Sequence, residues 1–285
     1  MTDIILRNNS LTVRIAPLGA EIQSICDGAG MERIWQGHQG YWSKHAPVLF
    51  PVAGGLREDT YLLDGKRYIM DKHGFVRERL FVVEEQTNTS ATFLLTGEAA
   101  AHAGFPFAYT LGARYTLCGD TLTAQTIVEN MGETPLWYSA GAHEAYACAG
   151  GASQWQLVFD EPETLAHSRL DRGLLTGETT SVPMDGKTLH LEDAHFANDT
   201  LVLASLASRS VTLQSELHPG KTRISFPDFD YLLVWTQVGA EFLCVEPWHN
   251  LPDRADTDQD ITRKPGMIQL DPGQVSTLTH TMTFM

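Results

Sequence analysis

Three acid or base side chains, far apart in the chain, stand out because each lies at or just past the end of a strand-like apolar run. They are His73 in a Lys-His-Gly-Phe frame, His143 in Gly-Ala-His-Glu and Glu246 in Val-Glu-Pro-Trp. An all-β scaffold can bring such strand ends together in one cleft. Imidazole and carboxylate groups transfer protons near neutral pH, so these residues indicate general acid–base chemistry.

The scaffold that must position them shows alternation of apolar and polar residues from beginning to end, as in 11–15 and 276–284. This period of two is typical of half-buried strands, and no long helical periodicity accompanies it. Hairpins are predicted at 61–68 and 115–123, where Asp-Gly and Gly-Asp pairs tolerate positive φ. We therefore predict an all-β fold, a large antiparallel β-sandwich formed by residues 1–285 as a single domain.

Composition limits the classes of partner that the chain can bind. The chain has 285 residues, of which 43% are apolar and 19% charged, as expected of a folded protein. Its formal net charge of −15 disfavours nucleic acid and anionic membranes. No apolar run approaches the ~20 residues of a membrane-spanning helix, and the N-terminal residues lack the pattern of a signal peptide. The four cysteines are widely spaced, so we expect reduced thiols and a cytoplasmic protein.

Two motifs begin like metal sites but lack a required ligand or turn residue. The acidic run 256–260 opens like a calcium loop, yet Ile261 occupies the position of the invariant glycine. His143-Glu144 opens like a zinc-protease helix, yet Ala147 stands where the second histidine is needed. The chain also lacks a phosphate-binding glycine loop and a dinucleotide fingerprint. We expect neither a metal nor a cofactor.

Several segments together resemble the aldose 1-epimerase, or mutarotase, family, in particular its smaller bacterial members. The matching segments follow the family order over nearly the whole chain and are 46–51, 54–61, 73–77, 104–107, 128–130, 141–143 and 244–248. The resemblance implies a galactose mutarotase-like sandwich, or supersandwich. It also implies an isomerase that interconverts the α and β anomers of a free aldose without a cofactor.

The family pattern further implies a role for each site residue. Glu246 is then the base that takes the proton of the anomeric hydroxyl, and His143 is the acid that protonates the ring oxygen. Rotation about the C1–C2 bond and closure from the other face complete the interconversion. His73 and Arg57 then bind sugar hydroxyls or stabilise the developing charge, and Asp199 resembles the sugar-binding aspartate of the family. Among the candidate stacking faces Trp42, Trp235 and Trp248, we favour Trp248 because it lies two residues after the base.

Two alternatives use the same site. In the first, the substrate is a hexose 6-phosphate whose phosphate is held by Arg77 and Arg79, shortly after His73. Acidic residues beside these arginines favour the free sugar. In the second, the protein binds a carbohydrate without turnover, because fold does not fix function. The presence of both Glu246 and His143 favours catalysis. As partners we expect a small-molecule sugar, neither nucleic acid nor membrane, and a monomer or homodimer.

Overall fold

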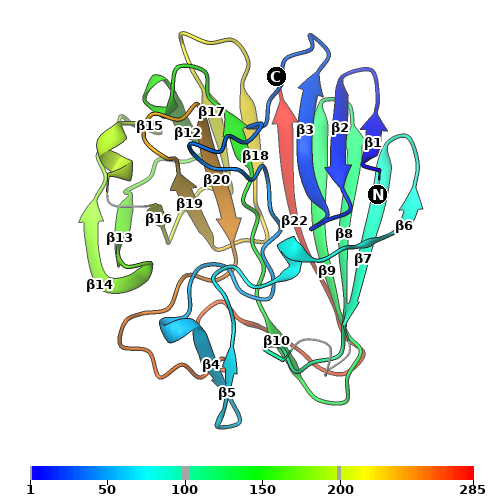
Figure 1. Cartoon of the computed structure of the whole chain (residues 1–285). Coiled ribbons are helices and arrows are strands. Elements are labelled where there is room, and N and C mark those ends of the chain that lie inside the picture. Colours follow the sequence, from blue (N-terminus) through cyan, green and yellow to red (C-terminus); the bar gives the residue numbers. More distant parts are fainter. Residues whose placement is uncertain (1, 98–102, 198–199) are drawn as a thin grey trace.

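The computed structural model describes residues 2–97, 103–197 and 200–285. The protein is about 48% strand and 5% helix. Its largest sheet has nine antiparallel strands and runs from β6 at the right of Figure 1 to β15 at the upper left. In order across the sheet, the strands are β15 (Thr188–His190), β12 (Gln156–Phe159), β17 (Ser210–Gln214), β18 (Thr222–Ser225), β22 (Val275–Phe284), β9 (Thr121–Asn130), β8 (Tyr109–Cys118), β7 (Ser90–Gly97) and β6 (Val82–Gln86).

A second, six-stranded antiparallel sheet lies at the left of Figure 1 and carries part of the candidate site. Its strands in order are β11 (Ala145–Ala147), β20 (Phe242–Trp248), β19 (Tyr231–Trp235), β16 (Leu201–Leu203), β13 (Ala166–Asp171) and β14 (Leu174–Ser181). Every residue of β20 is buried. Such a near-continuous apolar run is typical of a strand covered on both faces. The pairing of Ala145 with Cys244 places the chain just before β11 alongside Glu246.

Smaller elements complete the molecule. They are the sheet β1 (Ile4–Arg7), β2 (Leu11–Ala16) and β3 (Glu21–Asp27), the pairs β4 (Thr60–Leu63) with β5 (Lys66–Ile69) and β10 (Leu136–Tyr138) with β21 (Ile268–Leu270), and the short 3₁₀ helices η1 (Arg57–Asp59), η2 (Val76–Glu78), η3 (Ala152–Gln154) and η4 (Asp193–Phe196). Burial alternates along β2, so one face of this strand packs inward. The three-stranded sheet is tied to β8 where the Tyr115 hydroxyl donates to the carbonyl of Ala20 at 2.8 Å.

The predicted all-β antiparallel sandwich and both predicted hairpins are confirmed. Asp64 and Gly65, with φ of 51° and 75°, form the left-handed turn between β4 and β5. Strands β8 and β9 form the second hairpin. One cluster of buried apolar side chains extends along the chain from Leu6 to Phe284.

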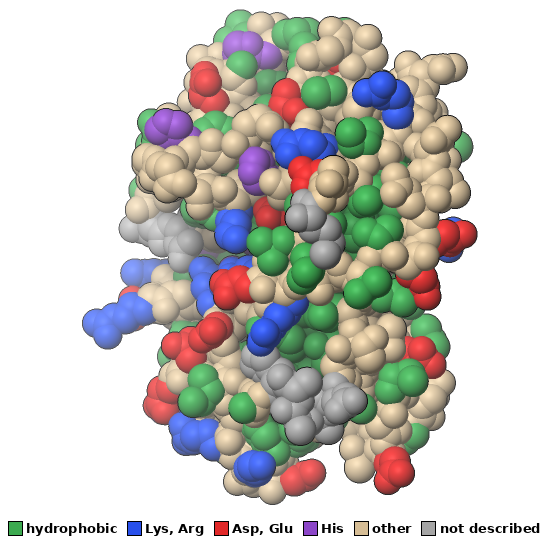
Figure 2. Space-filling model, turned by 45° about the vertical axis from the view of Figure 1, so that its right-hand side comes forward, with side chains coloured by type: hydrophobic (Ala, Val, Ile, Leu, Met, Phe, Trp, Pro, Cys, Tyr) green, Lys and Arg blue, Asp and Glu red, His purple; other side chains and the backbone are tan. Residues whose placement is uncertain are grey.

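The surface, the thiols and the helices add three observations. On the face shown in Figure 2, several basic side chains gather at the left near mid-height, and acidic side chains lie beside them. All four cysteines are free thiols. Among the described residues, no helix combines the length and the apolar character that crossing a membrane requires.

Candidate active site

Four of the predicted site residues line one cavity of about 350 Å³. They are His73, His143, Glu246 and Trp248. The volume is within the usual range for small-molecule sites. The residues come from the turn after β5, the loop before β11 and strand β20, so the fold brings together three distant segments.

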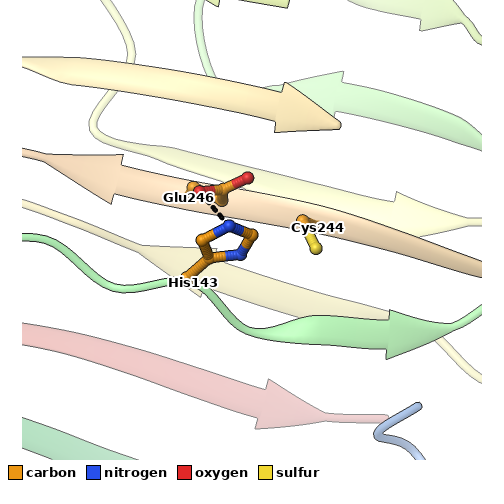
Figure 3. A group of neighbouring side chains, drawn as sticks. All are labelled: His143, Cys244 and Glu246. Carbon is orange, nitrogen blue, oxygen red and sulfur yellow. Dashed lines mark ion pairs between the residues drawn. The ribbon is translucent and has the colours of Figure 1, made fainter. Parts of the chain in front are cut away.

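Glu246 and His143 form the centre of this cavity. Glu246 lies within β20 with its side chain 2% exposed, and the side chain of His143 is 11% exposed. The Nε2 atom of His143 is 3.4 Å from Oε2 of Glu246, and Figure 3 shows the imidazole edge turned toward the carboxylate. The backbone N–H of Ala142 donates to the carbonyl of Pro247 at 3.0 Å, which holds the histidine loop beside β20. The acid and the base predicted from sequence are therefore neighbours.

The surroundings of His143 keep its ring neutral. The Trp42 ring stacks on the imidazole at 4.8 Å between ring centroids, with an angle of 22°. Burial, followed by the positive charges of Lys72 and Arg77, lowers the pKa of His143 to about 3. At pH 7 the imidazole therefore carries no net charge.

His73 occupies a backbone turn that the sequence signals through Gly74. Both residues have positive φ, 68° and 70°, and a Cβ on Gly74 would lie 2.0 Å from the carbonyl oxygen of Phe50. The backbone N–H of Gly54 donates to Nδ1 of His73 at 3.1 Å. Burial, the largest cause, lowers the pKa of His73 well below its ordinary value. The ring is therefore neutral, with its proton on Nε2 and available to a ligand oxygen.

Trp248 supports both histidines. Its ring meets His73 edge-on at 5.3 Å, and its Nε1 donates to the carbonyl of Ala142 at 3.2 Å. A Cβ on Gly141 would lie 2.7 Å from Cδ1 of Trp248, so the loop that carries His143 needs glycine to pass the indole. This aromatic side chain lines the cavity and fixes the loop as well.

The structure does not bring Arg57 into this site. Arg57 is not one of the described residues that line the cavity. Its guanidinium donates to the carbonyl of Thr257 at 3.2 Å, and its Nε is 3.7 Å from Oε1 of Glu58. These contacts direct the side chain toward the loop after β20. Asp199 lies outside the described residues, while its neighbour Thr200 lines the cavity.

The cationic residues that line the cavity differ from the two arginines that the sequence suggested as a phosphate site. Arg77 lines the cavity as expected, whereas Arg79 is exposed and its guanidinium lies 5.7 Å from the centre of the Phe75 ring. Lys44 and Lys72 also line the cavity, and sequence reasoning missed both. Their positions in the sequence could have indicated this, because each lies within two residues of a histidine or tryptophan of the site.

One group of potential metal ligands includes His143 and Glu246. Ligand atoms of His143, Cys244 and Glu246 lie within 4.8 Å of one another, as Figure 3 shows. Zinc accepts these ligand types. Burial, as the largest cause, raises the pKa of the Cys244 thiol well above its ordinary value, which opposes the thiolate that a metal requires. That the site works without a metal stays a prediction.

Comparison with known proteins shows the family to which the chain belongs. The model of the family "Aldose 1-epimerase" matches residues 2–267. Protein LacX of Lactococcus lactis subsp. lactis is 31% identical over 294 residues, which cover 98% of each chain. A galactose mutarotase related enzyme from Lactobacillus acidophilus has a TM-score of 0.94 at 28% identity, covering 100% of this chain and 97% of that one. A galactose mutarotase-like protein from Lactobacillus casei has a TM-score of 0.94 at 29% identity, covering 99% and 100%. The resemblance seen in the sequence is confirmed, and the chain belongs to the aldose 1-epimerase family.

Proposed function

We propose that the protein is an aldose 1-epimerase in which Glu246 acts as the base and His143 as the acid. The observation that carries this proposal is their 3.4 Å approach on the wall of a cavity large enough for a sugar. The anomeric hydroxyl oxygen and the ring oxygen of a pyranose are bonded to the same carbon. Two proton-transfer groups that act on these oxygens therefore have to face the same small region of a cavity, as these two do.

The reaction follows from the two groups. The carboxylate of Glu246 takes the anomeric proton while the ring oxygen receives a proton from His143, and the C1–O5 bond breaks to give the open-chain aldehyde. After rotation about C1–C2, the ring closes from the other face, and the two residues exchange roles. Each positioned proton-transfer group contributes about 10²–10⁴-fold.

Binding of the sugar falls to the other cavity residues. His73 offers its Nε2–H to a hydroxyl oxygen, because its Nδ1 is already engaged by Gly54. The rings of Trp42, Trp235 and Trp248 line the same cavity and suit the apolar C–H face of a pyranose. A binding role for Asp199 stays a prediction.

The test is the rate of anomer exchange, measured by NMR exchange spectroscopy on equilibrated sugars. In Glu246→Gln the amide keeps the shape of the side chain but cannot take a proton, so we expect kcat to fall about 10²–10⁴-fold with little change in sugar binding. His143→Asn should behave similarly. Glu178→Gln, at a site whose side chain is 67% exposed, is the matched control and should keep full activity. Full activity in Glu246→Gln would remove Glu246 as the base, and a wild-type protein that binds sugar without speeding exchange would support a carbohydrate-binding role.

A further inference from the structure

We propose that the substrate of this site is a sugar phosphate whose phosphate group lies against Lys44, Lys72 and Arg77. The inference rests on the proposed epimerase site and names its substrate class. These three cationic side chains line the same cavity as Glu246 and His143, in a chain whose net charge is −15. A neutral aldose offers no charged group that such a lining would recognise.

In the part of the chain that the structure describes, the three cationic side chains have no carboxylate partner. Among the described residues, Lys44, Lys72 and Arg77 form no ion pair with a carboxylate within 4.0 Å. Arg77 donates from Nη2 to the carbonyl of Lys72 at 3.1 Å, which orders its side chain without neutralising it. Glu58, which precedes Lys72 and Arg77 in the sequence, is paired with Arg67 at 3.3 Å instead. The three cations therefore remain available to a ligand.

The same cations act on the acid of the proposed reaction. The charges of Lys72 and Arg77 contribute, after burial, to lowering the pKa of both His143 and His73, so they lie within electrostatic reach of both rings. An anion bound between the cations and the rings would offset this contribution and raise the pKa of His143. A charged substrate would then help His143 to hold the proton that it delivers to the ring oxygen.

The number and type of cations favour phosphate over carboxylate. A phosphate monoester carries about −1.5 to −2 charges at pH 7 and has three acceptor oxygens. The planar guanidinium of Arg77 can donate to two of these oxygens at once. The ammonium groups of Lys44 and Lys72 can then neutralise the rest of the negative charge. A sugar carboxylate, with a single negative charge, would leave this wall with excess positive charge.

The experiment compares kcat/KM for anomer exchange of glucose and galactose, their 6-phosphates, and glucuronate. In the wild type we expect a preference of about 10²-fold for a 6-phosphate over its free sugar. Lys72→Met and Arg77→Met should each reduce this preference about 10-fold or more, because each removes one charge-assisted contact. Lys66→Met on β5, exposed and outside the cavity, makes the same change in net charge and should leave the preference unaltered.

The outcomes separate this inference from the proposed function. Equal kcat/KM for free and phosphorylated sugars, or a preference unchanged in Lys72→Met and Arg77→Met, overturns the inference and leaves the epimerase standing. A preference for glucuronate over both 6-phosphates overturns the assignment of phosphate. If no sugar is exchanged, the proposed function fails. Calorimetric titration of the wild type with the same ligands then decides the inference, which requires tighter binding of a 6-phosphate that is weakened in both cation variants.

Discussion

Acid should destabilise this protein through His143, with a sign that tests the electrostatics of the site. Burial, followed by the charges of Lys72 and Arg77, lowers the pKa of this ring to about 3, whereas an unfolded chain has a histidine pKa of about 6.5. Between these values the unfolded chain binds a proton that the folded protein excludes. The free energy of unfolding should therefore decrease as pH falls through this window, by up to about 1.4 kcal/mol per pH unit from this residue.

The matched variant is His143→Asn, whose amide cannot titrate. Acidification from pH 6.5 to pH 5 should destabilise the wild type more than the variant, by up to about 2 kcal/mol. His73, whose pKa is also lowered, keeps a residual slope of the same sign in the variant. Urea unfolding followed by tryptophan fluorescence at several pH values between 5 and 7 measures the difference.

Two results would contradict this reasoning about His143. Equal loss of stability in the wild type and in His143→Asn would mean that burial does not hold the ring neutral. A greater loss in the variant would mean that Glu246, 3.4 Å away, outweighs burial and raises the histidine pKa. In that case the stabilising contribution would be present below the unfolded pKa and would disappear as pH rises.

The remaining predictions concern the support of the site. Glu144 and His280 are both buried, and their side chains pair at 2.9 Å. His280→Ala should leave the buried carboxylate without this partner and lower the free energy of unfolding, measured with urea, by about 3–5 kcal/mol. A loss under about 1 kcal/mol would contradict this. In Gly74→Ala the new Cβ would lie 2.0 Å from the Phe50 carbonyl oxygen at a φ of 70°. We expect a loss of about 2 kcal/mol or more and slower anomer exchange, with Gly65→Ala, also at positive φ but with open space around its Cβ, as the less affected control.

Much of the fold, and the presence of His143 and Glu246 in one cavity, could be predicted because the responsible signals are local. The alternation of β2 and the Asp64-Gly65 turn depend on a few consecutive residues. The apolar run that ends in Glu246 likewise marks a buried carboxylate, which needs a partner or a function. Of the three cations that line the cavity, Arg77 was proposed from the sequence, whereas Lys44 and Lys72 could not be predicted in the same way. Side chains from loops face a cavity or avoid it according to tertiary contacts such as the Arg57 bond to Thr257, which no local pattern encodes.

The arrangement of charge connects these observations. Burial alone favours a neutral His143, and the adjacent cations add to that effect, so the protein by itself disfavours the protonated form of its proposed acid. An ionised carboxylate at Glu246, 3.4 Å from the ring, would act in the opposite direction. The pKa of His143 therefore depends on what lies beside Lys72 and Arg77, because the charges of these two residues contribute to its shift. A substrate anion on that wall would therefore affect both its own binding and the proton supply for ring opening. A neutral sugar could gain only from the contacts made by its ring and hydroxyl groups.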